Sequence, residues 1–352
     1  MRKTPLKIYT DRCYLPPAIN HCQLLIPFWG DNGCEHDGYT EFQRVGRNFL
    51  TLSPSSEADC AVLPFDGSIL INKKDARHDT AVAMANRFVR ACSITGLKTI
   101  ILVNSDSDKH IEIPNTVVIR TSLNRRTRRK NEFALPAWHD DLENYRGGEV
   151  SYLEWKIPPA IGFCGHVVSN APPISRQLKI MSQNMCRMLG VYFSHNDGIF
   201  LRRDAINSLS RIPEIKTEFI ARQTYFGGAI ENPQDAKKIR REYVDNLAHN
   251  DYSLCVRGYG NFSFRFFEAM SLGRIPLLLD TECVLPYDFL HDYRDYCLIV
   301  PEDRINSLPR ILLNFHRKFD ADSFLSWQKR VRDFWLNWLS PQGFFSHISL
   351  HL

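Results

Sequence analysis

Two charged residues three positions apart, Arg265 and Glu268, are the residues of this sequence best suited to hold a charged ligand. A glycine-containing loop, residues 257–262, precedes them, and Arg257 begins it. Guanidinium groups bind phosphate oxygens in a bidentate way, and a carboxylate accepts hydrogen bonds from two neighbouring hydroxyl groups, as a ribose offers. The residue types and their spacing therefore indicate a nucleotide-sugar site.

The residues around this pair predict a strand, a loop, a helix and a second strand. Apolar runs at Tyr252–Val256 and Ile275–Leu279 have strand composition, and a helical pattern begins near Ser263 and ends at Gly273. Ser263 is a favoured N-cap residue, so the unpaired amides of the first helical turn would face the loop and favour a phosphate. Gly258 permits close approach of the backbone to a ligand. Taken alone, the charged pair would be an ordinary surface ion pair, and the order of all the parts favours a ligand site.

The whole segment resembles the nucleotide-sugar motif of the exostosin-like glycosyltransferases. The residues that carry the resemblance are the strand Ser253–Val256, then Arg265, Glu268 and Ala269, and the helix end Gly273–Pro276. Weaker matches to the same family occur at residues 57–65, at 133–136, and at 161–165 followed by Arg176. The resemblance covers about residues 57 to 286.

This resemblance implies an α/β protein of GT-B architecture, in which two Rossmann-like domains face each other and a C-terminal helix packs back across them. It implies an inverting transfer of a sugar from a nucleoside diphosphate, here uridine diphosphate, to a glycan or glycoconjugate acceptor, with no essential metal or other cofactor. Many retaining GT-B enzymes carry an acid eight residues before the ribose-binding glutamate. Gly260 occupies that position and fits an inverting enzyme.

The same resemblance implies a donor site in the second domain. Arg257 and Arg265 would bind the diphosphate, Glu268 the ribose, and Gly165 would begin a second loop facing the phosphates. The full set of donor-binding residues is Gly165, Arg176, Arg257, Gly258, Ser263, Arg265 and Glu268.

The chain of 352 residues is long for one hydrophobic core, so two domains are expected. Apolar runs alternate with helical patterns, which indicates parallel sheets covered by helices. We predict an acceptor-side domain at 1–150, a nucleotide-sugar-binding domain at 151–320, and a C-terminal helix and tail at 321–352. The expected strands are Leu24–Phe28, Cys60–Phe65, Thr99–Val103, Thr116–Ile119, Phe133–Trp138, Ala160–Cys164, Phe219–Phe226, Tyr252–Val256, Ile275–Leu279 and Cys297–Val300; the expected helices are Asp79–Thr95, Ser175–Leu189, Pro233–Ala248 and Asp322–Leu339.

An inverting transfer needs a general base beside the acceptor hydroxyl, and we expect it in the first domain after a strand. Asp66 follows the run Cys60–Phe65, and Asp37 lies in the loop after Leu24–Phe28. These two residues are the predicted catalytic bases. Trp29 and His36 are the predicted acceptor-binding residues.

Composition also bears on membrane insertion, metal binding and cellular location. No apolar segment approaches the roughly 20 residues of a membrane span. The ten cysteines are scattered without a CxxC pair, and no spacing of ligands supports a metal. Eukaryotic relatives usually carry a membrane anchor, whereas this sequence starts at Met1 without one. The sequence is therefore either that of a bacterial or viral cytoplasmic enzyme or a shortened form of a membrane-anchored protein, and the start at Met1 favours the cytoplasmic enzyme.

A basic run at residues 120–130, RTSLNRRTRRK, could instead indicate a surface that binds nucleic acid or another polyanion. It lacks the aromatic residues of a single-strand binder, so we expect a solvated loop between two strands and no nucleic-acid partner. An anionic glycan acceptor is a further possibility for this run. Two alternatives remain open for the whole protein, which are an unrelated or retaining GT-B transferase and a non-enzymatic polyanion-binding protein.

Overall fold

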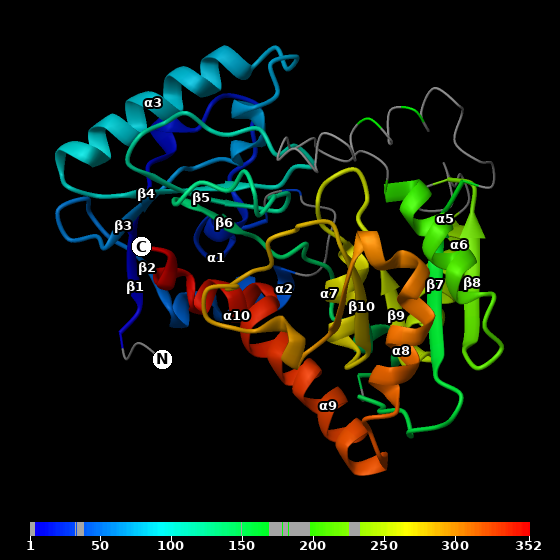
Figure 1. Ribbon diagram of the computed structural model, residues 1–352. Helices are drawn as coiled ribbons and strands as arrows, with labels where there is room; N and C mark the ends of the chain where they lie inside the picture. Colours follow the sequence, from blue (N-terminus) through cyan, green and yellow to red (C-terminus); the bar gives the residue numbers. More distant parts are fainter. Residues whose placement is uncertain are drawn as a thin grey trace.

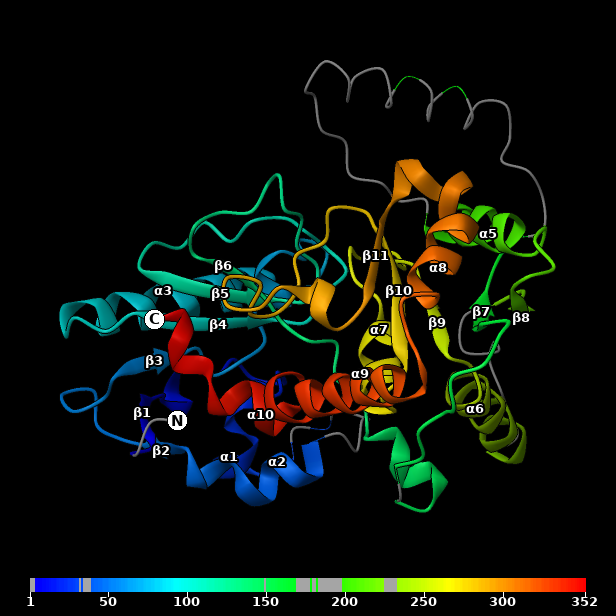
Figure 2. The ribbon, with the colours of Figure 1, turned by 60° about the horizontal axis from the view of Figure 1, so that its bottom comes forward.

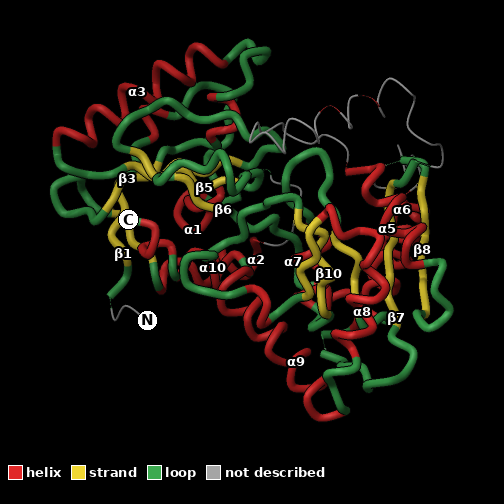
Figure 3. Tube along the Cα trace, viewed as in Figure 1, coloured by secondary structure: helices red, strands yellow, loops and turns green. Residues whose placement is uncertain are grey.

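The computed structural model describes residues 4–31, 33, 39–148, 150–168, 178, 182, 198–224 and 233–352. Two parallel β-sheets organise these residues, and they lie side by side with helices on their faces (Figures 1 and 3). The first sheet has the order β2-β1-β3-β4-β5-β6 and the second the order β11-β10-β9-β7-β8. The predicted α/β fold with two Rossmann-like domains is confirmed.

The first sheet is built from short strands whose central members are buried on both faces. Helix α3, His78–Ile94, covers one face, and the short helices α1, Ile26–Trp29, and α2, Thr40–Val45, lie on the other (Figure 1). Valine and isoleucine dominate β4 and β5, and such residues suit a strand packed on both sides. The strands are β1 Leu6–Tyr9, β2 Leu50–Leu52, β3 Cys60–Val62, β4 Thr99–Val103, β5 Thr116–Arg120 and β6 Glu132–Ala134.

One predicted strand of this domain is wrong. The run Leu24–Phe28 is helical, with a 3₁₀ turn at Gln23–Leu25 followed by α1. Pro27 lies in the first turn of α1, where its missing N–H costs no hydrogen bond. Strands β1 and β2 were not anticipated, because each is only three or four residues long.

The second sheet is covered by two pairs of helices. Helices α5 and α8 pack together on one face, and α6 and α7 lie on the other (Figure 2). The predicted helix Ser175–Leu189 lies outside the described residues. The elements are β7 Ala160–His166, α5 Gly198–Leu209, β8 Lys216–Arg222, α6 Pro233–Ala248, β9 Tyr252–Cys255, α7 Phe264–Ser271, β10 Ile275–Asp280, β11 Leu298–Pro301 and α8 Leu308–His316.

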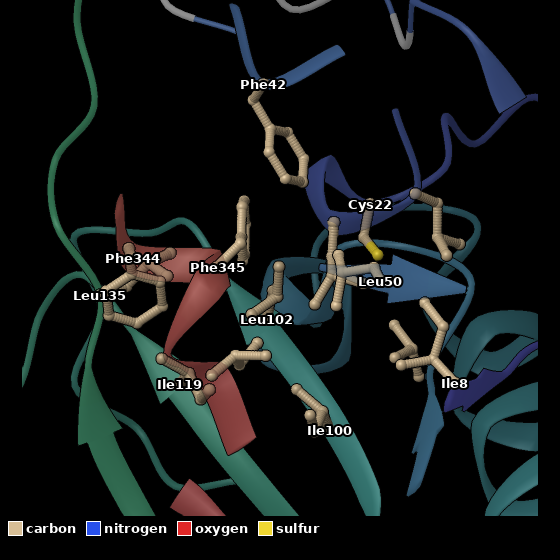
Figure 4. Close-up of a cluster of buried hydrophobic side chains, with 14 of the residues drawn as sticks. Ile8, Cys22, Phe42, Leu50, Ile100, Leu102, Ile119, Leu135, Phe344 and Phe345 are labelled. Carbon is tan, nitrogen blue, oxygen red and sulfur yellow. The ribbon is translucent and has the colours of Figure 1, made fainter. Parts of the chain in front are cut away.

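The C-terminal segment crosses from the second domain to the first, as predicted (Figures 1 and 2). Helix α9, Ala321–Phe334, packs on α7, a π turn follows at Trp335–Leu339, and α10, Pro341–Ser346, reaches the first domain. There Phe344 and Phe345 enter the core beside Phe42 and Leu135 (Figure 4). This segment therefore joins the two hydrophobic cores.

The end of this segment buries a histidine whose charge depends on pH. His351 packs against the rings of Tyr287, at 4.7 Å, and Phe133, at 4.8 Å. Burial lowers its pKa from 6.5 to about 4, the Ile348 carbonyl opposes this shift, and the charge of Arg128 adds to it. The folded chain therefore keeps His351 neutral at a pH where the unfolded chain protonates it.

We expect His351 to make the protein less stable in mild acid. Because its pKa is lower in the folded state, the stabilisation is complete above about pH 6.5 and is lost as the pH falls to about 4, a change of about 3 kcal/mol. Urea unfolding at pH 7.5 and 4.5 measures this effect in wild type and in His351→Phe. The variant should lose about 2–3 kcal/mol less than wild type over that range, and equal losses would contradict the assignment.

Candidate active site

The strand, loop, helix and strand predicted for residues 252–280 are present as β9, the loop 257–262, α7 and β10. Ser263 is the N-cap of α7, in extended conformation, and its side chain makes no capping hydrogen bond. Gly273 ends the turn after α7 with φ +65°, and a Cβ there would lie 3.0 Å from the Gln328 carbonyl oxygen. The Ser263 hydroxyl therefore makes no hydrogen bond to the amides of the first turn of α7.

Arg265 lies in the second domain's interior rather than on its surface. It is 7% exposed, and its Nη2 donates a hydrogen bond to the carbonyl of Cys164 in β7. Its guanidinium lies 4.1 Å from the centre of the Phe163 ring. A Cβ at Gly165 would lie 2.9 Å from Arg265 Nη2, so the absence of a side chain at 165 makes room for the guanidinium. The structure therefore brings Gly165 and Arg265 together, but Gly165 lies within β7, Ala160–His166, and does not begin a loop as predicted.

Two further buried arginines lie beside the same loop. Arg257 donates from Nη2 to the Tyr259 carbonyl, at 2.8 Å, and so curves the loop. Arg202 of α5 donates to the carbonyls of His166 and Val256, at 3.2 and 3.4 Å, and its Nη2 lies 3.7 Å from where a Cβ at Gly258 would be. Sequence reasoning missed Arg202, because only the packing of α5 brings it to the loop. Three guanidinium groups thus concentrate positive charge at one place.

Glu268 is also buried, at 4% exposure, one turn further along α7. Its Oε1 accepts a hydrogen bond from Arg240 Nη1 at 3.0 Å, and its Oε2 accepts one from the hydroxyl of Tyr243. Burial by itself would raise the pKa of Glu268, but His139, Arg240 and Tyr243 outweigh it and lower the pKa. The side chain is therefore an anion at neutral pH, held by two residues of α6.

The alternative that Arg265 and Glu268 form a surface ion pair is wrong, because both are buried and Glu268 pairs with Arg240. Arg240 and Tyr243 lie three residues apart on one face of α6, a spacing that could have drawn attention to them. A carboxylate has about four acceptor positions, so the two bonds to α6 leave capacity for a ligand hydroxyl.

The residues predicted for the acceptor side are less closely grouped. Asp66 accepts hydrogen bonds from the backbone amides of Ser68, at 2.8 Å, and Asn104, at 3.2 Å, and burial raises its pKa. Its carboxylate thus caps the 3₁₀ helix Gly67–Leu70. Trp29 ends α1 with the Arg12 guanidinium 4.7 Å from its ring centre, so it packs within the first domain.

Three predicted site residues, His36, Asp37 and Arg176, lie outside the described residues. The predicted strand before His36 and Asp37 is absent, since the run Leu24–Phe28 is helical.

The basic run lies between β5 and β6, as predicted, but its arginines are engaged with acidic residues. Across the domain seam the ion pairs are Arg125–Asp280 at 3.2 Å, Arg126–Glu282 at 2.5 Å and Arg128–Asp288 at 2.8 Å; within the first domain Arg129 pairs with Glu112 at 2.6 Å. The Arg125 amide also donates to the Glu282 carbonyl at 2.8 Å. The run therefore ties the two domains together, which removes the main reason for a polyanion-binding surface.

The loop 257–262 is itself held by the first domain. The Gly260 amide donates to Asp106 Oδ1 at 3.1 Å, and the Asn261 amide donates to Ser122 Oγ at 2.9 Å. Asn261 Nδ2 also reaches the carbonyls of Leu123 and Thr281, both at 3.3 Å. Asp106 follows β4, Ser122 follows β5 and Thr281 follows β10, so the carboxyl ends of both sheets meet at this loop.

Neither a metal site nor a membrane helix is found in the part of the chain that the structure describes. Within those residues, no group of three or more His, Cys, Asp or Glu side chains is placed to hold a metal ion. None of the described helices has the length and apolar character needed to cross a membrane.

Comparison with known proteins gives one family. Residues 149–315, which include all five strands of the second sheet, match the model of the Exostosin GT47 domain. A stretch of 79 residues, 22% of this chain, is 30% identical to Exostosin-1 homolog from Caenorhabditis elegans, and the match spans about a fifth of that protein's length (21%).

Likenesses to solved structures are slight. Spinosyn rhamnosyltransferase SpnG complexed with spinosyn aglycone is 11% identical, with a TM-score of 0.32 over 98% of this chain and 100% of that one. TarM is 9% identical, with a TM-score of 0.34 over 77% of this chain and 58% of that one. The family assignment rests instead on the matched domain and on the motif from Arg265 to Pro276 within it. Over residues 149–315 the chain is therefore similar to the exostosin-like glycosyltransferases, whose GT47 domain this stretch matches.

Proposed function

We propose that this protein transfers a sugar from a nucleoside diphosphate sugar, with uridine diphosphate (UDP) as the nucleotide, to a hydroxyl group of a glycan or glycoconjugate. The observation that carries this proposal is the grouping of Arg257, Arg265 and Glu268 around one loop and one helix N-terminus, inside the matched domain. Such a group offers charge to a diphosphate and an acceptor to a ribose within one helical turn.

The chemistry follows from where negative charge develops. When the bond between the anomeric carbon and the diphosphate breaks, its electron pair moves to the phosphate oxygen. Arg257, Arg265 and the first amides of α7 would stabilise that charge, and donors fixed in advance need little reorganisation to do so. These groups supply the positive charge without a metal ion, so we propose a metal-independent reaction.

We further propose that the anomeric configuration is inverted. Gly260 lies in the loop eight residues before Glu268, and it has no side chain that could act on the anomeric carbon from the donor side. We therefore propose that the acceptor hydroxyl attacks the anomeric carbon directly, from the face opposite the diphosphate. Such an attack inverts the anomeric configuration.

We also propose a cytoplasmic location. Seven of the eight described cysteines are buried, and burial raises the pKa of Cys22, Cys255 and Cys283 to about 12. Thiols kept protonated in this way are unreactive, which is consistent with a reducing compartment.

Calorimetric titration of the purified protein with UDP in the presence of EDTA tests the donor site. We expect saturable binding of UDP that exceeds binding of thymidine and adenosine diphosphates. The absence of UDP binding would overturn the proposed function, and binding only after addition of Mn²⁺ would overturn metal independence. Where a donor is turned over, proton NMR of the new anomeric centre decides the stereochemistry, and retention would favour the retaining GT-B alternative.

A further inference from the structure

One acidic side chain of the first domain contacts the loop that carries the proposed diphosphate site. Asp106 follows β4, and its Oδ1 accepts the hydrogen bond from the Gly260 amide at 3.1 Å. The residue is exposed. Within the described parts of the chain, its Oδ2 accepts no hydrogen bond. Asp106 therefore presents one carboxylate oxygen that is fixed and one that is open to an incoming ligand.

The chain on both sides of Asp106 lines a cavity in the first domain. This cavity has a volume of about 550 Å³ and lies beyond the carboxyl ends of β3 and β4. Hydroxyl, amide and charged side chains line much of it, among them Ser105, Ser107, Asn20, Asn72 and Lys109. Groups of this kind form the hydrogen bonds that orient a polyhydroxylated ligand. Asp106 is not itself a lining residue of this cavity; its neighbours Ser105 and Ser107 are, and Asp106 contacts the phosphate-site loop of the other domain.

Asp66, the base favoured by sequence reasoning, lines the same cavity but is differently employed. Its oxygens accept hydrogen bonds from the amides of Ser68 and Asn104, and those bonds hold the turns after β3 and β4. A substrate hydroxyl that took these acceptor positions would leave the partly buried amide of Ser68 and the exposed amide of Asn104 without their acceptor. Among the described residues, by contrast, the Asp106 carboxylate accepts one hydrogen bond, at Oδ1 from the Gly260 amide.

We propose that Asp106 is the general base of the transfer and that the adjoining cavity holds the carbohydrate acceptor; this rests on the proposed function. The open carboxylate oxygen of Asp106 takes the proton of the acceptor hydroxyl. The hydroxyl oxygen forms a bond to the anomeric carbon of the donor sugar, and the bond from that carbon to the diphosphate breaks. The electron pair leaves with UDP, so charge and atoms balance within the three participants.

The bond to Gly260 gives Asp106 a second effect, which is to bring the base and the phosphate site together. A side chain that only latches the loop would give the same static structure. Asparagine separates these roles, because its amide oxygen still accepts from the Gly260 amide but cannot take a proton. Alanine removes both functions.

The test uses the full chain with UDP-glucose, UDP-galactose, UDP-xylose, UDP-glucuronic acid and UDP-N-acetylglucosamine, and water as the acceptor, with release of UDP as the readout. Asp106→Asn and Asp106→Ala should both lower kcat by about 10²–10⁴-fold. The Kd for UDP should stay within about twofold of wild type in Asp106→Asn. Asp108→Asn, an acidic residue of the same loop, is the matched control and should keep wild-type turnover.

The outcomes separate the base from the function on which it depends. Turnover by Asp106→Asn at the wild-type rate, with loss only in Asp106→Ala, would show that Asp106 only holds the loop in place. It would overturn the proposal that Asp106 is the general base. UDP binding by wild type without turnover of any of the five donors would also overturn the proposal that Asp106 is the general base. Failure of wild type to bind UDP at all would overturn the proposed function itself.

Discussion

Replacing Arg265 by alanine is expected to weaken UDP binding by about 2–5 kcal/mol, or roughly 30-fold or more in Kd. Arg265 is 7% exposed, so its charge acts in surroundings that water screens weakly. It is held in place by the Cys164 carbonyl and by the Phe163 ring, 4.1 Å away. A diphosphate bound at the loop would lose a fixed, bidentate donor. Calorimetric titration with UDP measures the loss directly.

Two controls separate binding from folding in this experiment. Arg265→Lys keeps the positive charge but not the planar fork, and should recover only part of the affinity. Arg241→Ala removes an exposed arginine of α6, whose ion pair with Asp245 spans 3.8 Å, and should leave both UDP binding and the thermal midpoint unchanged. UDP affinity equal to wild type in a folded Arg265→Ala protein would show that the diphosphate site lies elsewhere.

Replacing Glu268 by alanine is expected to lower the free energy of unfolding by about 2–3 kcal/mol and to weaken UDP binding as well. The substitution leaves the partly buried guanidinium of Arg240 and the hydroxyl of Tyr243 without their acceptor. Urea unfolding and calorimetric titration measure the two effects separately. Glu268→Gln keeps the volume and one acceptor oxygen, and should be less destabilising.

The pH dependence of this contribution follows from the lowered pKa of Glu268. A carboxyl group whose pKa is lower in the folded state stabilises it above the ordinary value of 4.5, and the effect is lost as the pH falls through the lowered pKa. The Glu268 contribution should therefore be constant from pH 5 to 8. It should decline only in stronger acid.

A nucleotide without ribose hydroxyls distinguishes a ligand role of Glu268 from a structural one. Wild type should bind UDP roughly tenfold or more tightly than 2′,3′-dideoxy-UDP, because a hydrogen bond to a charged group is worth about 1.5–3 kcal/mol. Glu268→Gln should show a smaller difference between the two nucleotides. Equal affinity of wild type for both would make Glu268 only a tie between α7 and α6.

The donor half of the site could be predicted from the sequence because its parts lie close together in the chain. The strand, loop, helix and strand were placed within one or two residues, since apolar runs, a serine cap and a closing glycine mark their ends locally. The contact between Gly165 and Arg265 was implied only by the family motif, since 100 residues separate them. It depends on the pairing of β7 with β9.

The contacts of the first domain with the loop 257–262 could not be predicted, because they depend on how the domains pack. Nothing in the sequence around Asp106 marks it, and its importance arises only from its contact with Gly260, 154 positions away. Arg240 and Tyr243 likewise meet Glu268 only through the packing of α6 on α7. The strand prediction for Leu24–Phe28 was wrong for a different reason. Apolar residues buried on every side have neither helical nor strand periodicity, and composition alone does not separate the two.

The attachment of the loop 257–262 to both domains links two equilibria. Because Asp106 and Ser122 hold the amides of Gly260 and Asn261, separating the domains would break those hydrogen bonds and release the loop from its present shape. A ligand that binds only this shape must then oppose separation, by RT ln(1 + [L]/Kd). By reciprocity, contacts that hold the domains together, such as Arg126 with Glu282, raise ligand affinity. The contacts between the two domains thus couple ligand occupancy to the separation of the domains.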